Sequence, residues 1–384
     1  MSLSQGKIIF ARAKKLGFAA AGVTGTANLP AAAKKQADLP ANTSSFIVLA
    51  HQYPPFSLGE VYSGDVNIYL AQYSRGYDYH DHLKNKLKSL TKQISSVLGV
   101  KHHWYGVDNH PLSEKSLAQQ AGLGFLGKNN LLIIPGLGSL YFLALVASPL
   151  KLKYLVKTPA QIFFAGNNNK AIELDNSSSC QGCNKCIQVC PGNALNINGS
   201  FCKENCRSYL TQQRGILSLS QLKIIANNFW GCDDCQLVCP HNIYNYNANY
   251  YDSTIRNYSK NNWPLPGKLF PADFLNIAHN NSISSKLADY PFSWRGARIL
   301  LRNFLINLAH DKAYNYLSQI IKISENNSPI IRYYCGYYFY NLALEGRPVA
   351  YQELKKLYIQ ESDNNCREEL QKLLRKLSTE ERSQ

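Results

Sequence analysis

Hydrophobic residues recur at helical spacing in several parts of the chain. The clearest stretch is 83–98, where lysines occupy one face and the other face carries Leu83, Leu87, Leu90, Ile94 and Val97. This pattern predicts an amphipathic helix, with Asp78 as its candidate N-cap and Gly99 just after its end. Another helix is expected over 7–22, where Gly17 and Gly22 act as stop signals.

Short apolar runs between polar segments predict buried strands at 46–50, 131–134 and 141–146. Asp108 directly follows Val107, and this placement is typical of the end of a strand. We therefore expect the Asp108 carboxylate to point beyond the edge of the sheet.

The last third of the chain has a helical pattern. Arg298 and Arg302 lie off an apolar stripe that is formed by Ala297, Leu300, Leu301, Phe304, Leu305 and Leu308. Further helices are expected at 312–323, 329–344 and 349–377, and successive helices of this length are typical of a helical-repeat array. The same helices could instead serve only to cover the neighbouring domain. Two Asn-rich stretches without periodicity, 151–179 and 245–262, are expected to be connectors.

Composition narrows the possible partners and compartment. At 384 residues the chain has room for two or three domains. No apolar stretch approaches the roughly 20 residues of a membrane span. The first residues show neither a secretory apolar region nor twin arginines, so a reducing cytoplasm is expected. The net charge of +16 and the 25 tyrosines suit a polyanion with unstacked bases, such as RNA. A solvated, Lys-rich surface would explain the charge equally well.

Two dense cysteine runs point to specific chemistry. The first run, Cys180–Cys183–Cys186–Cys190 followed by Pro191, has the C-x2-C-x2-C-x3-C-P spacing of bacterial ferredoxins with 4Fe–4S clusters. The second run, Cys232–Cys235–Cys239, is a partial copy. In two-cluster ferredoxins the fourth Cys of each run ligates the other cluster.

This rule divides the thiols into two groups of four. The first cluster is expected to bind Cys180, Cys183, Cys186 and Cys239. The second is expected to bind Cys190, Cys232, Cys235 and either Cys202 or Cys206, because both lie between the runs. A zinc site would favour two C-x2-C pairs instead of these runs. A disulfide framework is disfavoured because nothing marks the chain as secreted.

Several stretches, in this order, resemble the epoxyqueuosine reductases, which are cobalamin-dependent, iron–sulfur enzymes of tRNA modification. The stretches before the first cysteine run are Asp78-Tyr79-His80, Val107-Asp108 with Pro111 and Glu114, 121–124, 127–129 and 138–139. The later ones are 206–211, 230–236, 293–296 and 302–303. The likeness covers most of the chain.

The resemblance implies an α+β fold in three domains. These are an N-terminal α/β cobalamin-binding domain at 1–170, a ferredoxin-like domain with two 4Fe–4S clusters at 171–250, and a HEAT-like helical domain at 265–384. It also implies the last step of queuosine biosynthesis, the removal of the epoxide oxygen from a base at the wobble position of tRNA. In the family, an external donor supplies electrons through the clusters to the corrin cobalt. We expect a monomer.

The resemblance also assigns roles to individual residues. Asp108 would donate the proton to the leaving oxygen, since burial against an apolar corrin face would favour the neutral acid. Cys206, rather than Cys202, would complete the second cluster, and Arg214 would face the tRNA. The residues implied as cobalamin contacts are Ala71, Asp108, Leu132, Leu143, Ser208 and Asp233.

Two other functions are weighed against this one. A reductive dehalogenase would share the corrin and the clusters, but those proteins carry a twin-arginine signal and lack a helical tail. An electron-transfer subunit would need little beyond its clusters, whereas about 170 residues precede them here.

Overall fold

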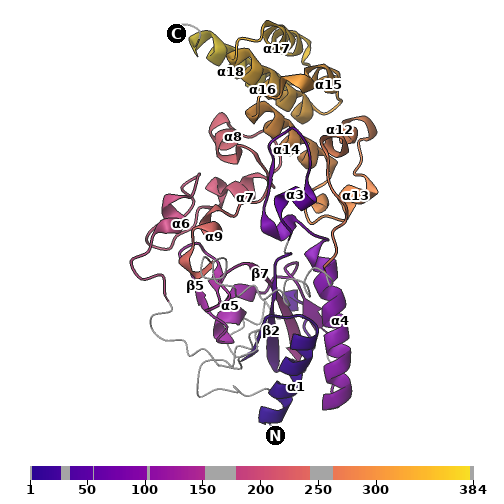
Figure 1. Cartoon of the computed structure of the whole chain (residues 1–384), viewed down its shortest axis with the longest axis vertical. Coiled ribbons are helices and arrows are strands. Elements are labelled where there is room, and N and C mark those ends of the chain that lie inside the picture. Colours follow the sequence, from indigo (N-terminus) through magenta and orange to yellow (C-terminus); the bar gives the residue numbers. More distant parts are fainter. Residues whose placement is uncertain are drawn as a thin grey trace. The chain divides into compact units, whose positions relative to one another are not determined.

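The computed structural model describes residues 2–26, 35–54, 56–101, 104–151, 179–242 and 263–380 (Figure 1). The chain separates into two compact units, each assembled from segments that are distant in sequence. Unit 1 comprises Met1–Phe56, Gly76–Phe201 and Asp233–Pro264, and unit 2 comprises Ser57–Arg75, Cys202–Cys232 and Leu265–Gln384. Most of both expected connectors lies outside the described residues, and the division into three domains stays a prediction.

Unit 1 is built on a four-stranded antiparallel sheet with the order β1-β2-β7-β4. The strands are β1 (Ala20–Gly25), β2 (Ser45–Gln52), β7 (Tyr141–Ser148) and β4 (Trp104–Gly106). The strands expected at 46–50 and 141–146 are confirmed as β2 and β7. Since every pairing in this sheet is antiparallel, it is not the parallel sheet that the term α/β usually denotes.

Helices cover both faces of this sheet. On one face, Phe46, Val48 and Leu145 share a core with α5 (Glu114–Gln120). Alternate side chains point to the other face, where the ring of His51 lies 5.6 Å from that of His82 on α4 (Tyr79–Leu98). Figure 1 shows α4 and α5 on opposite sides of β2. Burial on both faces explains why β2 and β7 are continuous apolar runs.

The helix predictions of the N-terminal half are partly confirmed. α4 matches the predicted helix at 83–98, begins after the Asp78 N-cap and ends at Gly99, which is left-handed with φ 66°. The helix expected over 7–22 is wrong beyond Lys15: α1 is Ser2–Lys15, and β1 begins at Ala20. Gly22 lies in β1, paired with Val48, and a Cβ there would lie 2.9 Å from the carbonyl oxygen of Ala121. Close approach of two backbones, not a helix stop, therefore requires this glycine.

The shorter elements of unit 1 are a small hairpin and two short helices. β5 (Phe125–Leu126) pairs with β6 (Leu132–Ile133), so the strand expected at 131–134 belongs to a small hairpin and not to the main sheet. Each cysteine run contains one short helix, α6 (Lys185–Gln188) in the first and α9 (Asp234–Leu237) in the second.

Unit 2 combines a small parallel strand pair with a helical array. β3 (Tyr69–Leu70) pairs in parallel with β8 (Asn228–Trp230). The short helices are α3 (Leu58–Val61), α7 (Arg207–Leu210), α8 (Leu219–Ile225), α13 (Ser285–Ala288) and α15 (Leu317–Ile323). The longer ones are α12 (Pro271–Asn280), α14 (Ala297–His310), α16 (Pro329–Leu344), α17 (Pro348–Gln360) and α18 (Asn364–Glu380). The single helix expected at 349–377 is thus two helices.

α14 holds the segment that follows the first cysteine run. Arg302 is fully buried, although it was expected off the apolar stripe, and it donates hydrogen bonds to the carbonyl oxygens of Leu210 and Thr211. Asn303 donates to the carbonyl oxygens of Thr211 and Phe229. Buried charge is stable only when its hydrogen bonds are satisfied, so these two side chains define the position of the α7 loop.

Among the helices within the described residues, none is long and apolar enough to cross a membrane.

Candidate iron–sulfur and catalytic site

Unit 1 brings together the four thiols expected to bind the first cluster. Burial raises the pKa of Cys186, and the charges of Cys180, Cys239 and Cys183 raise it further, so all four thiols lie within electrostatic reach of one another. All four are free of disulfides. Cys239 comes from the second run, and α6 and α9 contact each other. Thiols that repel one another's ionisation are suited to sharing a cationic cluster.

A hydrogen-bond network connects Lys128 to this thiol group. Its backbone N–H donates to Cys180 Sγ at 3.4 Å. Its ammonium donates to the carbonyl oxygen of Cys183 at 3.1 Å and to Oδ1 of Asn184 at 2.8 Å. Hydrogen bonds and net charge near the sulfurs set the potential of an iron–sulfur cluster. The sequence showed no signal for this role beyond the position of Lys128 in a family motif.

Replacing Lys128 with Met should lower the reduction potential of the first cluster, by tens of millivolts in order of magnitude. The positive charge stabilises the reduced, more negative cluster, whereas the backbone bond to Cys180 is retained in the variant. Redox titration followed by EPR measures the shift, with the exposed Lys101→Met as the matched control. An unchanged potential would show that the ammonium acts only on loop structure.

The ligands expected for the second cluster belong to both units. Cys190 and Cys235 are in unit 1, and Cys206 and Cys232 are in unit 2. Cys190 Sγ accepts a hydrogen bond from the backbone N–H of Ala194 at 3.2 Å. The thiol of Cys202 instead donates a hydrogen bond to the Glu204 carboxylate at 3.7 Å. This contact favours Cys206 as the fourth ligand, which stays a prediction.

The spacing of these thiols suits iron–sulfur clusters better than a zinc ion, which favours two C-x2-C pairs. In a 4Fe–4S cluster each thiolate binds a different iron, so the ligands surround a larger volume than zinc ligands do.

Asp108 lies at the end of β4, in a constrained loop. Its φ of 57° is left-handed, which is uncommon for a residue other than Gly. Its backbone N–H donates to Oε1 of Glu114 at 2.9 Å, and the same oxygen lies 3.1 Å from Nε2 of His110. The predicted strand end is thus confirmed, and Glu114, in the first turn of α5, holds the loop.

Tyr79 and His80, at the start of α4, lie against the Asp108 carboxylate, and the N-cap Asp78 contacts His80. The Tyr79 hydroxyl donates to Oδ2 of Asp108 at 2.6 Å. Nε2 of His80 lies 3.8 Å from the same oxygen, at ion-pair distance, and has no hydrogen-bond partner although it is buried. Nδ1 of His80 lies 2.7 Å from Oδ1 of Asp78. The sequence analysis named Asp78 as a helix cap and as part of a family stretch, but it assigned no role to the i, i+2 pair of Asp78 and His80.

The protonation states differ from the expectation for Asp108. The hydrogen-bonding interaction with His80 and the hydrogen bond from Tyr79 lower the pKa of Asp108. Burial disfavours charge on His80, but the carboxylates of Asp108 and Asp78 outweigh it and raise the His80 pKa to about 9. The shift of the Asp108 pKa is opposite in direction to the one expected for Asp108 against an apolar corrin face, and that expectation stays a prediction. At neutral pH the carboxylate is ionised, and the proton resides on the imidazole.

The residues implied as cobalamin contacts have different surroundings. Asp108 exposes 62% of its side chain. Leu132 and Leu143 lie in the α5-side core, and the carbonyl oxygen of Leu132 accepts a hydrogen bond from the Tyr141 hydroxyl. Asp233 is fully buried in unit 1. Ala71, fully buried, and Ser208, half-buried, belong to unit 2. Their contact with a corrin stays a prediction.

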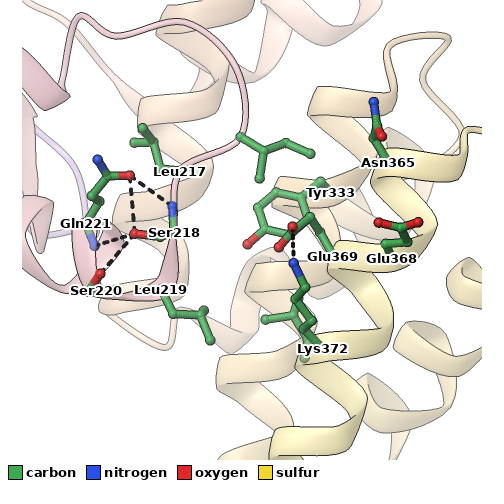
Figure 2. Close-up of a pocket in the computed structure, with 12 residues that line it drawn as sticks. Leu217, Ser218, Leu219, Ser220, Gln221, Tyr333, Asn365, Glu368, Glu369 and Lys372 are labelled. Carbon is green, nitrogen blue, oxygen red and sulfur yellow. Dashed lines mark hydrogen bonds and ion pairs between the residues drawn. The ribbon is translucent and has the colours of Figure 1, made fainter.

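Unit 2 contains a pocket of about 680 Å³ between the start of α8 and helices α16 and α18. Figure 2 shows Tyr333 and Lys372 on one side and Ser218 with Gln221 on the other. Lys372 pairs with Glu369 at 2.6 Å. Arg214 is exposed in unit 2 but does not line this pocket, and neither do the predicted cofactor residues.

Two family models match parts of the chain. A "4Fe-4S double cluster binding domain" matches residues 179–242, which include all eight expected thiol ligands. The model "Epoxyqueuosine reductase QueG, DUF1730" matches residues 35–109, which end just after Asp108. The chain thus carries a double-cluster 4Fe–4S domain, as its cysteine spacing predicted.

Curated relatives and solved structures agree with these models. Epoxyqueuosine reductase of Vibrio cholerae is 35% identical over 42% of this chain and 39% of its own length. That of Listeria monocytogenes is 30% identical over 70% of this chain and 64% of its own length. The matched region thus spans only about two fifths of the Vibrio relative. A crystal structure of a selenomethionine-labelled epoxyqueuosine reductase superposes with a TM-score of 0.77 at 24% identity, covering 98% of this chain and all of the other.

The mixed helix-and-strand fold is therefore that of the solved epoxyqueuosine reductases. The family resemblance inferred from the motifs is confirmed by the matches to both family models and to the curated relatives. These likenesses identify the chain as a relative of the epoxyqueuosine reductases.

Proposed function

We propose that this chain reduces epoxyqueuosine to queuosine at the wobble position of tRNA, the last step of queuosine biosynthesis. The observation that carries the proposal is that one chain combines the thiols of a double-cluster 4Fe–4S domain with an Asp108 carboxylate that is hydrogen-bonded by Tyr79. The clusters provide a route for electrons, and Asp108 provides a carboxylate that exchanges a proton. A protein that only carried electrons would have no use for the Asp108 loop.

The reaction has a defined balance. The epoxide gains two electrons and two protons, both carbon–oxygen bonds of the ring break, the alkene forms, and the oxygen leaves as water. Electrons enter from an external donor through the two clusters. The departing oxygen needs a proton as its negative charge develops, and Asp108 delivers it. Glu114 holds the loop that positions this carboxylate.

Cobalamin is part of this proposal, and the site fits it in part. Asp108 exposes its carboxylate beside the Tyr79 ring, which stacks on Phe142 at 4.1 Å, so a polar and an aromatic surface are available to a ligand. The buried Leu132 and Leu143 would act through backbone groups. When bound, cobalamin would supply a strongly reducing cobalt for the two-electron reduction. Asp233, Ala71 and Ser208 would complete its contacts.

The test is anaerobic reconstitution with iron, sulfide and cobalamin, followed by reaction with tRNA that contains epoxyqueuosine. Nucleoside mass spectrometry should detect queuosine with the full set and none when cobalamin is omitted. Conversion of a chlorinated aromatic compound, with no queuosine formed, would favour the reductive dehalogenase. A cytoplasmic monomer is part of the same proposal, and size-exclusion chromatography with light scattering tests its oligomeric state.

tRNA is the proposed partner. One of the similar structures is that of an epoxyqueuosine reductase with a tRNA-Tyr epoxyqueuosine-modified stem loop; it has a TM-score of 0.74 at 23% identity. The net charge of +16 suits phosphate contacts.

The affinity for tRNA should therefore fall steeply as the salt concentration rises, and Arg214→Ala should reduce the slope of log K against log salt by about 1. Filter binding at several salt concentrations measures both, with exposed Lys92→Ala as control. Affinity that does not change with salt would contradict this reading of the charge.

A further inference from the structure

The His80 imidazole occupies an unusual position between two carboxylates. Nδ1 is 2.7 Å from Asp78 and Nε2 is 3.8 Å from Asp108. The His80 side chain is only 14% exposed, and its ring stacks on Tyr79 at 4.0 Å. A charge at this depth is stable only with partners, and both partners are acids.

We propose that His80, positioned by Asp78, is the proton reservoir of the reaction and protonates Asp108 as Asp108 protonates the leaving oxygen. This inference rests on the proposed function. Nε2–H of His80 gives its proton to Oδ2 of Asp108, and Asp108 passes a proton to the oxygen as the carbon–oxygen bond breaks. His80 becomes neutral and is recharged from solvent. The same transfer, repeated, supplies the second proton that makes water.

The geometry suits a proton transfer in which the distance between His80 and Asp108 shortens when substrate binds. Nε2 and Oδ2 are 3.8 Å apart, and catalytic hydrogen bonds are often long before substrate binds. The buried Nε2 has no other hydrogen-bond partner, so no competing acceptor must be displaced. Asp78 fixes the orientation of the ring by holding Nδ1, which leaves Nε2 to face Asp108.

The surrounding charges favour the imidazolium. On α4 and its cap, the Asp78 carboxylate raises the pKa of His80, and Lys84 interacts with Asp78. From the β4–α5 segment, Asp108 faces His80 directly, while His110 and Glu114 interact with the Asp108 loop. The net effect raises the His80 pKa to about 9. Turnover should therefore be constant at neutral pH and fall as pH rises through about 9, where His80 loses its proton.

The experiment combines a direct titration with the pH profile of single turnover. In protein labelled with ¹⁵N-histidine, the signal missing from His80→Gln identifies His80, and its pKa should be near 9. Asp78→Asn should move that pKa toward the ordinary value of about 6.5. The alkaline fall in single-turnover rate should move by the same amount. His80→Gln should react about 100-fold more slowly at pH 7, and exposed His279→Gln should behave as wild type.

Each outcome separates this inference from the proposed function. If wild type forms no queuosine, the proposed function fails, whatever the NMR titration shows. If wild type is active but the rate profile of Asp78→Asn stays in place while the His80 pKa moves, His80 is not the reservoir. Turnover by His80→Gln at the wild-type rate would also show that His80 is not the proton reservoir. Folding of the variants is checked by the unchanged signals of the other histidines.

Discussion

Asp108→Asn should retain both clusters and the fold but reduce epoxyqueuosine at least about 100-fold more slowly than wild type at neutral pH. The amide has nearly the same shape as the carboxylate, but it can neither accept a proton from His80 nor deliver one to the leaving oxygen. Asn also tolerates the left-handed backbone at this position, where φ is 57°. The loop should therefore keep its hydrogen bond to Glu114.

Single-turnover assay of epoxyqueuosine-containing tRNA measures this effect, with iron content and thermal unfolding confirming that the variant is intact. The matched control is Asp81→Asn, which removes an exposed carboxylate from the first turn of α4, the helix that carries Tyr79 and His80. Queuosine formed at the wild-type rate by Asp108→Asn would remove Asp108 from the mechanism. An equal loss in the Asp81 variant would point to a general effect of charge.

The other large effect is expected for Cys239→Ala, which should lose the first cluster. The iron content should fall from about eight to about four per chain, because a 4Fe–4S cluster needs four thiolates. Turnover should be abolished, since electrons would no longer have both clusters to pass through. Cys239 is 8% exposed and becomes a slightly smaller apolar residue, so the cost to folding should be small beside the loss of metal.

Iron analysis and EPR of the dithionite-reduced protein measure this prediction. Cys202→Ala is the matched control, because Cys202 lies between the runs but its thiol is bonded to Glu204. It should keep about eight irons, whereas Cys206→Ala should lose the second cluster. Full iron content in Cys239→Ala would show that the fourth ligand of the first cluster is another residue.

Local sequence patterns predicted much of the secondary structure. The period of Leu83, Leu87 and Leu90 specified α4, and the continuous apolar run at 46–50 specified β2. Prediction failed at β1, which consists mostly of small residues, because the helix was extended to 22 and Gly22 was taken as its stop signal. Small residues carry little periodicity, and the pairing of Ala20 with Ala50 across the sheet decided the conformation.

Long-range contacts also determine which polar residues of the helical region are buried. Arg302 lies off the apolar stripe by helical period, yet it is fully buried. Its burial depends on the carbonyl oxygens of Leu210 and Thr211, which are about 90 residues away in sequence. No local pattern distinguishes such an arginine from one that faces solvent.

The sequence by itself determined the chemistry available to this protein. Ligand spacing in a cysteine run is local, so the spacing alone predicted the 4Fe–4S clusters. The position of Asp108 directly after Val107 likewise predicted a strand end. Only the tertiary structure decided how these groups are tuned. The ionised Asp108, the proton on His80 and the position of Lys128 depend on distances between segments 28 to 56 residues apart. Electrostatic energy depends on separation in space, which the order of residues does not specify.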